Sequence, residues 1–131
     1  MVFYGEYEVS ITSSGRVALP KKIRDTLAAT TVVVTKGFGE CLAGYSKQDW
    51  EKRAETLLDV SLLDREQIDK RRILFSSTVH VELDDQGRIV LPKNLRTFAI
   101  RSKKVVITGV GDHFEIWDKT RWDSYMKEIA K

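Results

Sequence analysis

The stretch Ser14-Gly15-Arg16-Val17-Ala18-Leu19-Pro20-Lys21-Lys22-Ile23-Arg24 decides how this chain folds. It occurs again 72 positions later as Gln86-Gly87-Arg88-Ile89-Val90-Leu91-Pro92-Lys93-Asn94-Leu95-Arg96. Gly, Arg, Leu, Pro, Lys and Arg keep their register, and the core positions between them exchange one aliphatic residue for another. A repeat at a fixed period predicts the tandem duplication of one small structural unit.

The similarity between the two halves extends beyond this motif. Alternating apolar and polar residues at 7–11 and 79–83 predict half-buried strands. The apolar run 32–35 matches 105–108, and Trp50 matches Trp122. Each half is therefore predicted to run strand, turn, strand, short helix, strand, glycine-containing turn, strand, helix. We divide the chain into a first unit at 1–53, a helical connector at 54–76 and a second unit at 77–131.

Amphipathic helices are predicted around Trp50, within the connector and around Trp122. Ser46, Asp64 and Asp118 stand at their starts, where a side-chain oxygen can cap the first backbone N–H groups. The aromatic side chains of these helices are expected to serve in core packing or subunit contact.

Size and charge set limits on the protein's partners. The chain has 131 residues, a net charge of +3 and a pI near 9.0. Units of about sixty residues bury little surface alone, which favours mutual packing or oligomerisation. Residues 15–24 hold four cations and no acid, and residues 87–96 hold three and no acid. This segregation indicates an anionic partner meeting one face, although a merely solvated basic face would show the same pattern.

The repeated motif also predicts where its cations lie. Gly15 and Gly87 tolerate the positive φ of tight hairpin turns, so Arg16 and Arg88 begin the returning strands. Pro20 and Pro92 stand where a helix can begin.

Arg24 and Arg96 follow those prolines by four residues and are expected on the outer side of each helix. Guanidinium groups in such a row suit phosphates and the O6/N7 edge of guanine. The alternative is that each arginine pairs with a nearby carboxylate. That alternative is stronger for Arg88, which has Asp84 and Asp85 in its hairpin, than for Arg16.

The second copy resembles the repeat of the MraZ family, within the wider class of AbrB-like swapped-hairpin DNA-binding domains. The resemblance rests on Asp84-Asp85-Gln86-Gly87-Arg88, on Leu91-Pro92 with Arg96, on the doubling of the motif and on Phe114-Glu115-Ile116-Trp117-Asp118. It covers residues 1 to 130. In the first copy, Thr12 stands where the second copy has the motif acid Asp84.

The resemblance implies an α+β fold, a tandem pseudo-symmetric pair of swapped-hairpin units with flanking helices. It also implies a bacterial transcriptional regulator of the division and cell-wall gene cluster, assembled as a ring that contacts several short repeats in a promoter. Sequence-specific binding to double-stranded DNA is the expected function. The expected DNA-binding residues are Arg16, Arg88, Arg24, Arg96, Lys21, Lys22, Lys93 and Ser14, with Gly15 and Gly87 in the turns and Asp84 as the motif acid.

The sequence does not favour an enzyme. His80 and His113 are not at metal-ligand spacing with each other or with Cys41, and no glycine-rich phosphate loop follows a strand. We expect no catalytic residue, metal, cofactor, small-molecule substrate or membrane association. The alternatives are an antitoxin of the same fold class, which would bind DNA and a toxin, and a structural ring that acts through protein partners. A lone cysteine and the absence of a signal peptide predict a cytoplasmic protein, and the expected DNA binding adds association with the nucleoid.

Overall fold

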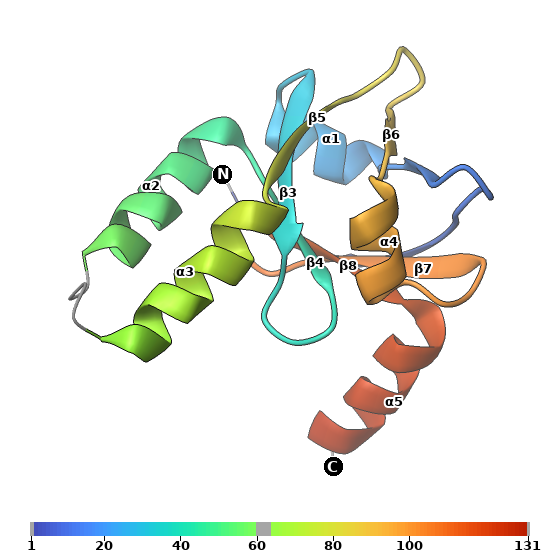
Figure 1. Cartoon of the computed structure of the whole chain (residues 1–131). Helices are drawn as coiled ribbons and strands as arrows, with labels where there is room; N and C mark the ends of the chain where they lie inside the picture. Colours follow the sequence, from blue (N-terminus) through green and yellow to red (C-terminus); the bar gives the residue numbers. More distant parts are fainter. Residues whose placement is uncertain (1, 60–63, 131) are drawn as a thin grey trace.

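The computed structural model describes residues 2–59 and 64–130 (Figure 1). The predicted order of elements is present in both halves, and a further helix, α3, joins them. The elements are β1 (Glu6–Ser10), β2 (Arg16–Ala18), α1 (Lys21–Leu27), β3 (Thr31–Lys36), β4 (Leu42–Tyr45), α2 (Lys47–Leu58), α3 (Arg65–Ser77), β5 (Val79–Glu82), β6 (Arg88–Val90), α4 (Lys93–Ala99), β7 (Lys104–Gly109), β8 (Phe114–Asp118) and α5 (Lys119–Ile129).

The helix starts follow the capping residues of the sequence. The Ser46 hydroxyl accepts a hydrogen bond from the backbone N–H of Asp49 at 3.1 Å at the start of α2. The Asp64 carboxylate accepts from the N–H of Glu66 at 3.0 Å at the start of α3. Asp118 does the same for α5. Pro20 and Pro92 occupy the position just before α1 and α4, both with φ −57° and ψ 148°.

The halves exchange strands within one sheet. The six-stranded sheet has the order β1-β7-β8-β4-β3-β5. β1 of the first half pairs antiparallel with β7 of the second, and β5 of the second half pairs antiparallel with β3 of the first. Each half thus gives its first strand to the other half's hairpin, and the core is shared. The unit boundaries at residues 53 and 76 stay a prediction, because this exchange makes one body of both halves.

Both faces of the sheet are covered. Val32, Val34 and Ile107 point to the main core, which also holds buried apolar residues of β2, β6, α1 and α4, namely Val17, Ile89, Ile23, Leu27, Leu95 and Ala99. Val33 and Val106 point to the opposite face, where they meet the Trp50 cluster and the Trp122 cluster respectively. The two tryptophans are buried, with 8% and 9% exposed. Of the two roles expected for them, core packing and subunit contact, the structure shows core packing.

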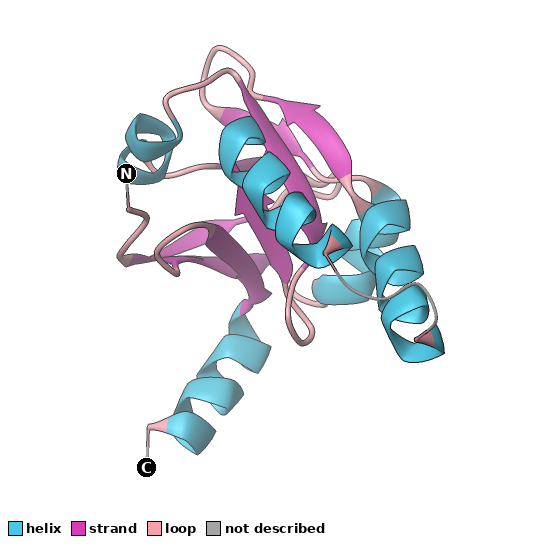
Figure 2. Ribbon diagram, turned by 90° about the vertical axis from the view of Figure 1, so that its left-hand side faces the viewer, coloured by secondary structure: helices cyan, strands magenta, loops and turns pink. Residues whose placement is uncertain are grey.

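The helices lie on different sides of this body. α2 and α3 run beside each other at one side, whereas α5 projects from the opposite end (Figures 1 and 2). No helix among the described residues combines the length and apolar character needed to cross a membrane.

Candidate nucleic-acid interface

The two Gly-Arg hairpins have nearly the same turn. Gly15 and Gly87 have φ of 87° and 75°, the left-handed region that glycine adopts without strain. Each glycine N–H donates to the carbonyl three residues earlier, Gly15 to Thr12 at 2.9 Å and Gly87 to Asp84 at 3.0 Å. The repeated sequence therefore gives repeated geometry, and each turn brings its arginine to the start of a strand.

The strands after these turns pair with each other. β2 and β6 form a two-stranded antiparallel ribbon in which Arg16 lies opposite Val90 and Arg88 lies opposite Ala18. Strand side chains alternate between faces, so both arginines share one face of the ribbon. The other face carries Val17 and Ile89, which are 0% and 1% exposed. The buried pair fixes the ribbon on the core and leaves the arginine face outward.

The ribbon is joined to both turns by reciprocal backbone bonds. The N–H of Leu19 donates to the Gly87 carbonyl at 3.0 Å, and the N–H of Leu91 donates to the Gly15 carbonyl at 2.8 Å. Each half therefore holds the turn of the other, and the arrangement is pseudo-two-fold. Two hairpin arginines that are 72 positions apart in sequence become neighbours on one small surface.

The two arginines differ in their restraint. The Arg88 Nε donates to Asp84 Oδ2 at 2.9 Å, and the Arg88 backbone N–H donates to Asp84 Oδ1 at 2.9 Å. The N–H of Arg88 is the largest of several contacts that lower the pKa of Asp84, and the guanidinium adds to them. Asp84 thus remains charged and orients Arg88, so the ion pair considered from sequence exists.

In the first hairpin, Thr12 performs only part of this role. Its Oγ1 accepts from the backbone N–H of Arg16 at 2.9 Å and contacts the Ser14 hydroxyl at 3.0 Å. Within the described residues, the Arg16 side chain has no hydrogen bond or ion pair. Threonine therefore preserves the turn but leaves the Arg16 guanidinium unrestrained.

Arg24 and Arg96 lie across the pseudo-two-fold from their own hairpins. Both are half-buried, and each Nε donates to a carbonyl of its own half, Leu19 at 3.0 Å and Leu91 at 3.1 Å. Each guanidinium packs on the glycine of the opposite turn. A Cβ on Gly15 would come within 2.5 Å of the Arg96 side chain, and one on Gly87 would come equally near Arg24. The sequence placed these arginines on the outer side, whereas the structure uses them to brace the turns.

The lysines of the motif start the two short helices. Lys21 forms an exposed ion pair with Asp25 at 3.3 Å, and Lys22 lies over the Tyr4 ring at 5.6 Å. Lys93 is exposed at the start of α4. These lysines are exposed to solvent, and their contacts with DNA stay a prediction.

Comparison with known proteins agrees with this double-hairpin organisation. A family model described as "MraZ protein, putative antitoxin-like" matches twice, over residues 2–73 and 74–131. A transcriptional regulator MraZ of Roseiflexus castenholzii is 41% identical over 98% of this chain and 89% of its own length. This chain belongs to the MraZ family.

Other MraZ regulators match over a similar span. The protein of Acetivibrio thermocellus is 40% identical over 95% of this chain and 86% of its own length. That of Ligilactobacillus salivarius is 38% identical over 99% and 90%. The helices and the antiparallel sheet confirm the α+β fold expected from the sequence. The relatives named as transcriptional regulators confirm the expected regulatory class.

Some features of this MraZ-family chain were not found by sequence reasoning. His113 lies between the Asp112 and Glu115 carboxylates, at 2.7 and 3.3 Å, and stacks on the Tyr45 ring at 4.9 Å. Burial lowers the pKa of His113, but its hydrogen bonds to Glu115 and Asp112 outweigh that effect and raise the pKa above 6.5. Only the local order Asp112-His113-x-Glu115 could have indicated this ion-paired cluster.

Cys41 lies buried beside this cluster, near Glu115. Burial and the neighbouring Glu115 raise the pKa of the Cys41 thiol to about 12, which keeps it protonated and unreactive. Across the described residues, no three His, Cys, Asp or Glu side chains are placed to hold a metal ion.

Proposed function

We propose that this protein binds double-stranded DNA sequence-specifically and regulates transcription from a promoter with short repeats, in the division and cell-wall gene cluster. The carrying observation is the β2–β6 ribbon, which presents Arg16 and Arg88 from adjacent antiparallel strands on its outward face. A two-stranded ribbon fits the major groove of B-DNA, and arginine is the side chain that binds guanine O6 and N7 in two contacts. Such a function would keep the protein at the nucleoid.

Pseudo-symmetry supports this function. Two arginines related by a pseudo-two-fold axis match the approximate two-fold symmetry of a short DNA site, as paired half-sites do for dimeric regulators. Candidate phosphate contacts, which position a protein on DNA without reading sequence, come from Lys21 and Lys22 at the start of α1, Lys93 at the start of α4 and Ser14 in the first hairpin turn.

The proposal is tested by Arg16→Ala and Arg88→Ala, measured by fluorescence anisotropy on a duplex from the protein's own upstream region. Each substitution should weaken binding by about 1–3 kcal/mol, the worth of a bidentate base contact. Circular dichroism should be unchanged, because neither side chain is buried in the core. Wild-type affinity in both variants would reject this function. A loss of stability without a loss of affinity for Arg88→Ala would reduce that residue to a structural ion pair.

We further propose that the protein assembles head to tail into a closed ring. A groove of about 540 Å³ lies between the β3–β4 hairpin, α2 and α3, with an apolar floor that includes Tyr45 and Trp50. Phe38 at its mouth is 97% exposed. On the projecting helix α5, Tyr125 and Ile129 are 41% and 55% exposed.

Both surfaces expose apolar side chains, Phe38 at the groove and Tyr125 and Ile129 on α5. Both are also mixed in charge: Lys36, Arg53, Lys70 and Glu115 line the groove, and α5 carries Asp123 and Glu128 together with Lys119, Arg121 and Lys127. We assign the groove to α5 of a second copy. Because the groove and α5 are different surfaces, the contact is heterologous, and repeated heterologous contacts close into a ring when the rotation permits.

Light scattering at micromolar concentration should give a mass several times 15.0 kDa. Phe38→Ser should reduce this mass without loss of fold, since the side chain has almost no contact within the chain. Val2→Ser, at another exposed apolar residue (65% exposed), serves as the matched control. A wild-type monomer, or equal masses for the two variants, would contradict this interface.

A further inference from the structure

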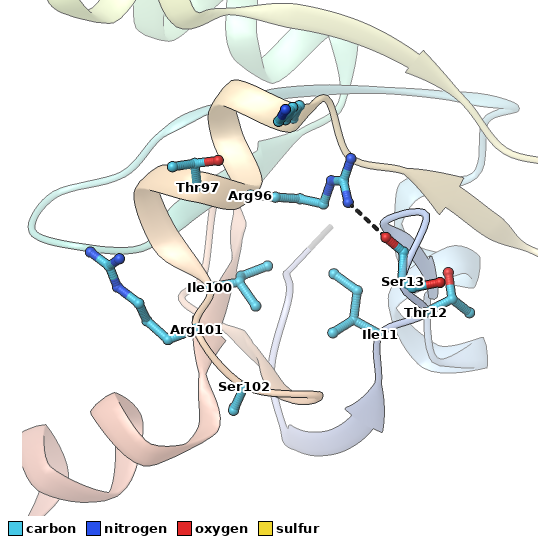
Figure 3. A pocket seen from close by; sticks show the side chains of 9 residues that line it. Ile11, Thr12, Ser13, Arg96, Thr97, Ile100, Arg101 and Ser102 are labelled. Carbon is cyan, nitrogen blue, oxygen red and sulfur yellow. Dashed lines mark hydrogen bonds between the residues drawn. The ribbon is translucent and has the colours of Figure 1, made fainter.

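A second hollow lies between the first hairpin and α4 (Figure 3). Its volume is about 510 Å³, within the range of small-ligand pockets. Ile11 and Ile100 form apolar walls that face each other, and Arg96 reaches across the mouth to the Ser13 carbonyl, with its Nη1 donating at 3.1 Å.

The charge of the lining is one-sided. Lys93, Arg96 and Arg101 contribute three cations, and none of the lining residues is acidic. Arg96 uses Nε for Leu91 and one Nη1 hydrogen for Ser13. Within the described part of the chain, the other three of its five N–H donors have no protein partner. Arg101 is exposed at the edge of the hollow on the Thr97 side, and its side chain points away from Ile11 and Ser13.

One buried acid does touch the wall from behind. Asp118, 3% exposed, accepts hydrogen bonds from the Arg101 N–H, the Ser102 N–H, the Ser102 hydroxyl and the Arg121 N–H. Burial raises the pKa of Asp118, but these bonds outweigh it and lower the pKa. Asp118 therefore stays charged behind the wall and offsets at most one of the three positive charges of the lining, which leaves the hollow with a positive excess.

The internal repeat supplies a comparison site within the same molecule. Shifting the lining residues by 72 positions replaces Thr12, Ser13 and Thr97 by Asp84, Asp85 and Asp25, and replaces Arg101 by Ala29. The counterpart thus has two cations, Lys21 and Arg24, with three acids. The turn and the bracing arginine are alike in the two halves, whereas the chain that follows the short helix differs, because Ala28 is left-handed at φ 51° and Ile100 is extended at φ −123°. The counterpart therefore differs in this stretch of backbone and in side-chain charge, and its acids disfavour an anion.

We propose that the hollow beside Arg96 binds a phosphate ester. Arginine and hydroxyl groups recognise phosphate through charge-assisted hydrogen bonds, and the two isoleucines can receive the sugar that carries it. The ester comes either from a free nucleotide or from a DNA backbone that continues past the first hairpin. The second source rests on the proposed DNA-binding function, and the first does not.

The free source is tested by titrating the full chain with thymidine 5′-monophosphate and, separately, with thymidine, using amide NMR shifts. We expect saturable shifts at Ser13, Thr97 and Arg101 with the monophosphate and none with thymidine. Thr97→Asp, which installs the counterpart's acid on an exposed helix position, should weaken the effect about tenfold or more, the worth of one strong charged contact. Asn94→Asp adds the same charge on α4 outside the lining and should have a smaller effect.

The DNA source is tested with the same variants by anisotropy at several salt concentrations. Thr97→Asp should lower affinity more than Asn94→Asp and should reduce the log–log salt slope by about 0.9, the share of one phosphate. Asp25→Thr, which removes the counterpart's acid, should not lower affinity. Binding of thymidine monophosphate without a DNA effect assigns the site to a free nucleotide.

A DNA effect without nucleotide binding assigns the site to the backbone. If the two aspartate variants behave alike in both experiments, the inference is overturned. A protein that binds no DNA at all would refute the proposed function, but the nucleotide titration would still show whether this hollow binds a phosphate ester.

Discussion

At the scale of single residues, the two hairpins have similar backbone turns, but only the second holds its arginine side chain in place. Asp84 orients Arg88 through two hydrogen bonds at 2.9 Å, whereas Thr12 holds only the backbone of Arg16. A prepositioned guanidinium loses less freedom on binding than a mobile one. We therefore expect Arg88 to contribute more to sequence discrimination than Arg16.

Asp84→Asn tests this difference. The amide oxygen can still accept from the N–H groups of Gln86 and Arg88, so the turn should persist, but the ion pair with the Arg88 Nε disappears. Removing a negative charge strengthens non-specific DNA binding, while releasing Arg88 weakens the specific contact. The ratio of affinities for promoter and random DNA, measured by anisotropy at fixed salt, should therefore fall. An unchanged ratio would show that Asp84 only shapes the turn.

His113 should make stability depend on pH. Its pKa is raised in the folded protein, so the stabilisation is full below about 6.5 and is lost as pH rises through the folded value. Burial raises the pKa of Glu115, but hydrogen bonds from His113 and Trp117 outweigh this effect and lower the pKa, so Glu115 remains charged between pH 6 and pH 8. Urea midpoints should fall from pH 6 to pH 8 in the wild type. His113→Gln should lose that component, and an identical slope in both proteins would assign it elsewhere.

The residue scale also shows what the sequence could not predict. The spacing from Pro20 places Arg24 on a definite side of its helix, but periodicity does not tell which other segment covers that side. The covering segment is the turn around Gly87, which is far away in the chain. The bracing role of Arg24 and Arg96 follows from this tertiary contact, and only the structure reveals it.

At the scale of elements, the sequence patterns predicted the individual strands and helices but not which strands pair with each other. Strands, short helices and caps are encoded within a few residues, and they lie where alternation, proline and the capping side chains indicated. The exchange of β1 and β5 between halves depends on contacts between residues far apart in the sequence, 45 positions for Val34 with Val79 and 100 for Tyr7 with Ile107. An alternating strand fits either neighbour equally well. The resemblance to swapped-hairpin proteins, and not the strand pattern, supplied that expectation.

Arg24→Lys tests whether the packing and hydrogen bonding of Arg24 against the Gly87 turn, or only its positive charge, stabilise the fold. Lysine retains the positive charge but cannot reproduce the Nε bond to the Leu19 carbonyl. We expect a loss of about 1.5–3 kcal/mol in unfolding free energy, the net value of a hydrogen bond that involves a charged group. Denaturation in urea measures it, with the exposed Arg65→Lys as control. Full stability in Arg24→Lys would return this side chain to a simple surface role.

At the scale of the whole molecule, the cations act together. Lys21, Lys22 and Lys93 lie at helix starts on both sides of the ribbon, so affinity should depend steeply on salt through the release of counterions from phosphates. Replacing Lys21 and Lys22 by alanine should flatten the log–log slope by about 0.9 for each phosphate that the protein no longer neutralises. Promoter and random DNA should be weakened alike. Affinity independent of salt would rule out a phosphate-facing surface.

The ring would multiply these effects. A ribbon that carries two arginines is a small footprint, and weak contacts become strong when several copies engage neighbouring repeats at high effective concentration. In the proposed ring, the groove beneath Phe38 and the projecting α5 would each contact one neighbour, and this would account for the apolar side chains exposed at both places. The proposed assembly surface and the proposed DNA-binding ribbon are separate, so we expect that each can be disrupted without the other.

The most direct measurement is the affinity of the full chain for its own upstream duplex and for a shuffled duplex of equal length, with wild type and the Arg16→Ala/Arg88→Ala double variant side by side. We predict clear preference for the upstream duplex in the wild type. In the double variant, residual salt-dependent binding should be the same for both duplexes. A double variant that still prefers the upstream duplex as strongly as the wild type would contradict the ribbon as the reading surface.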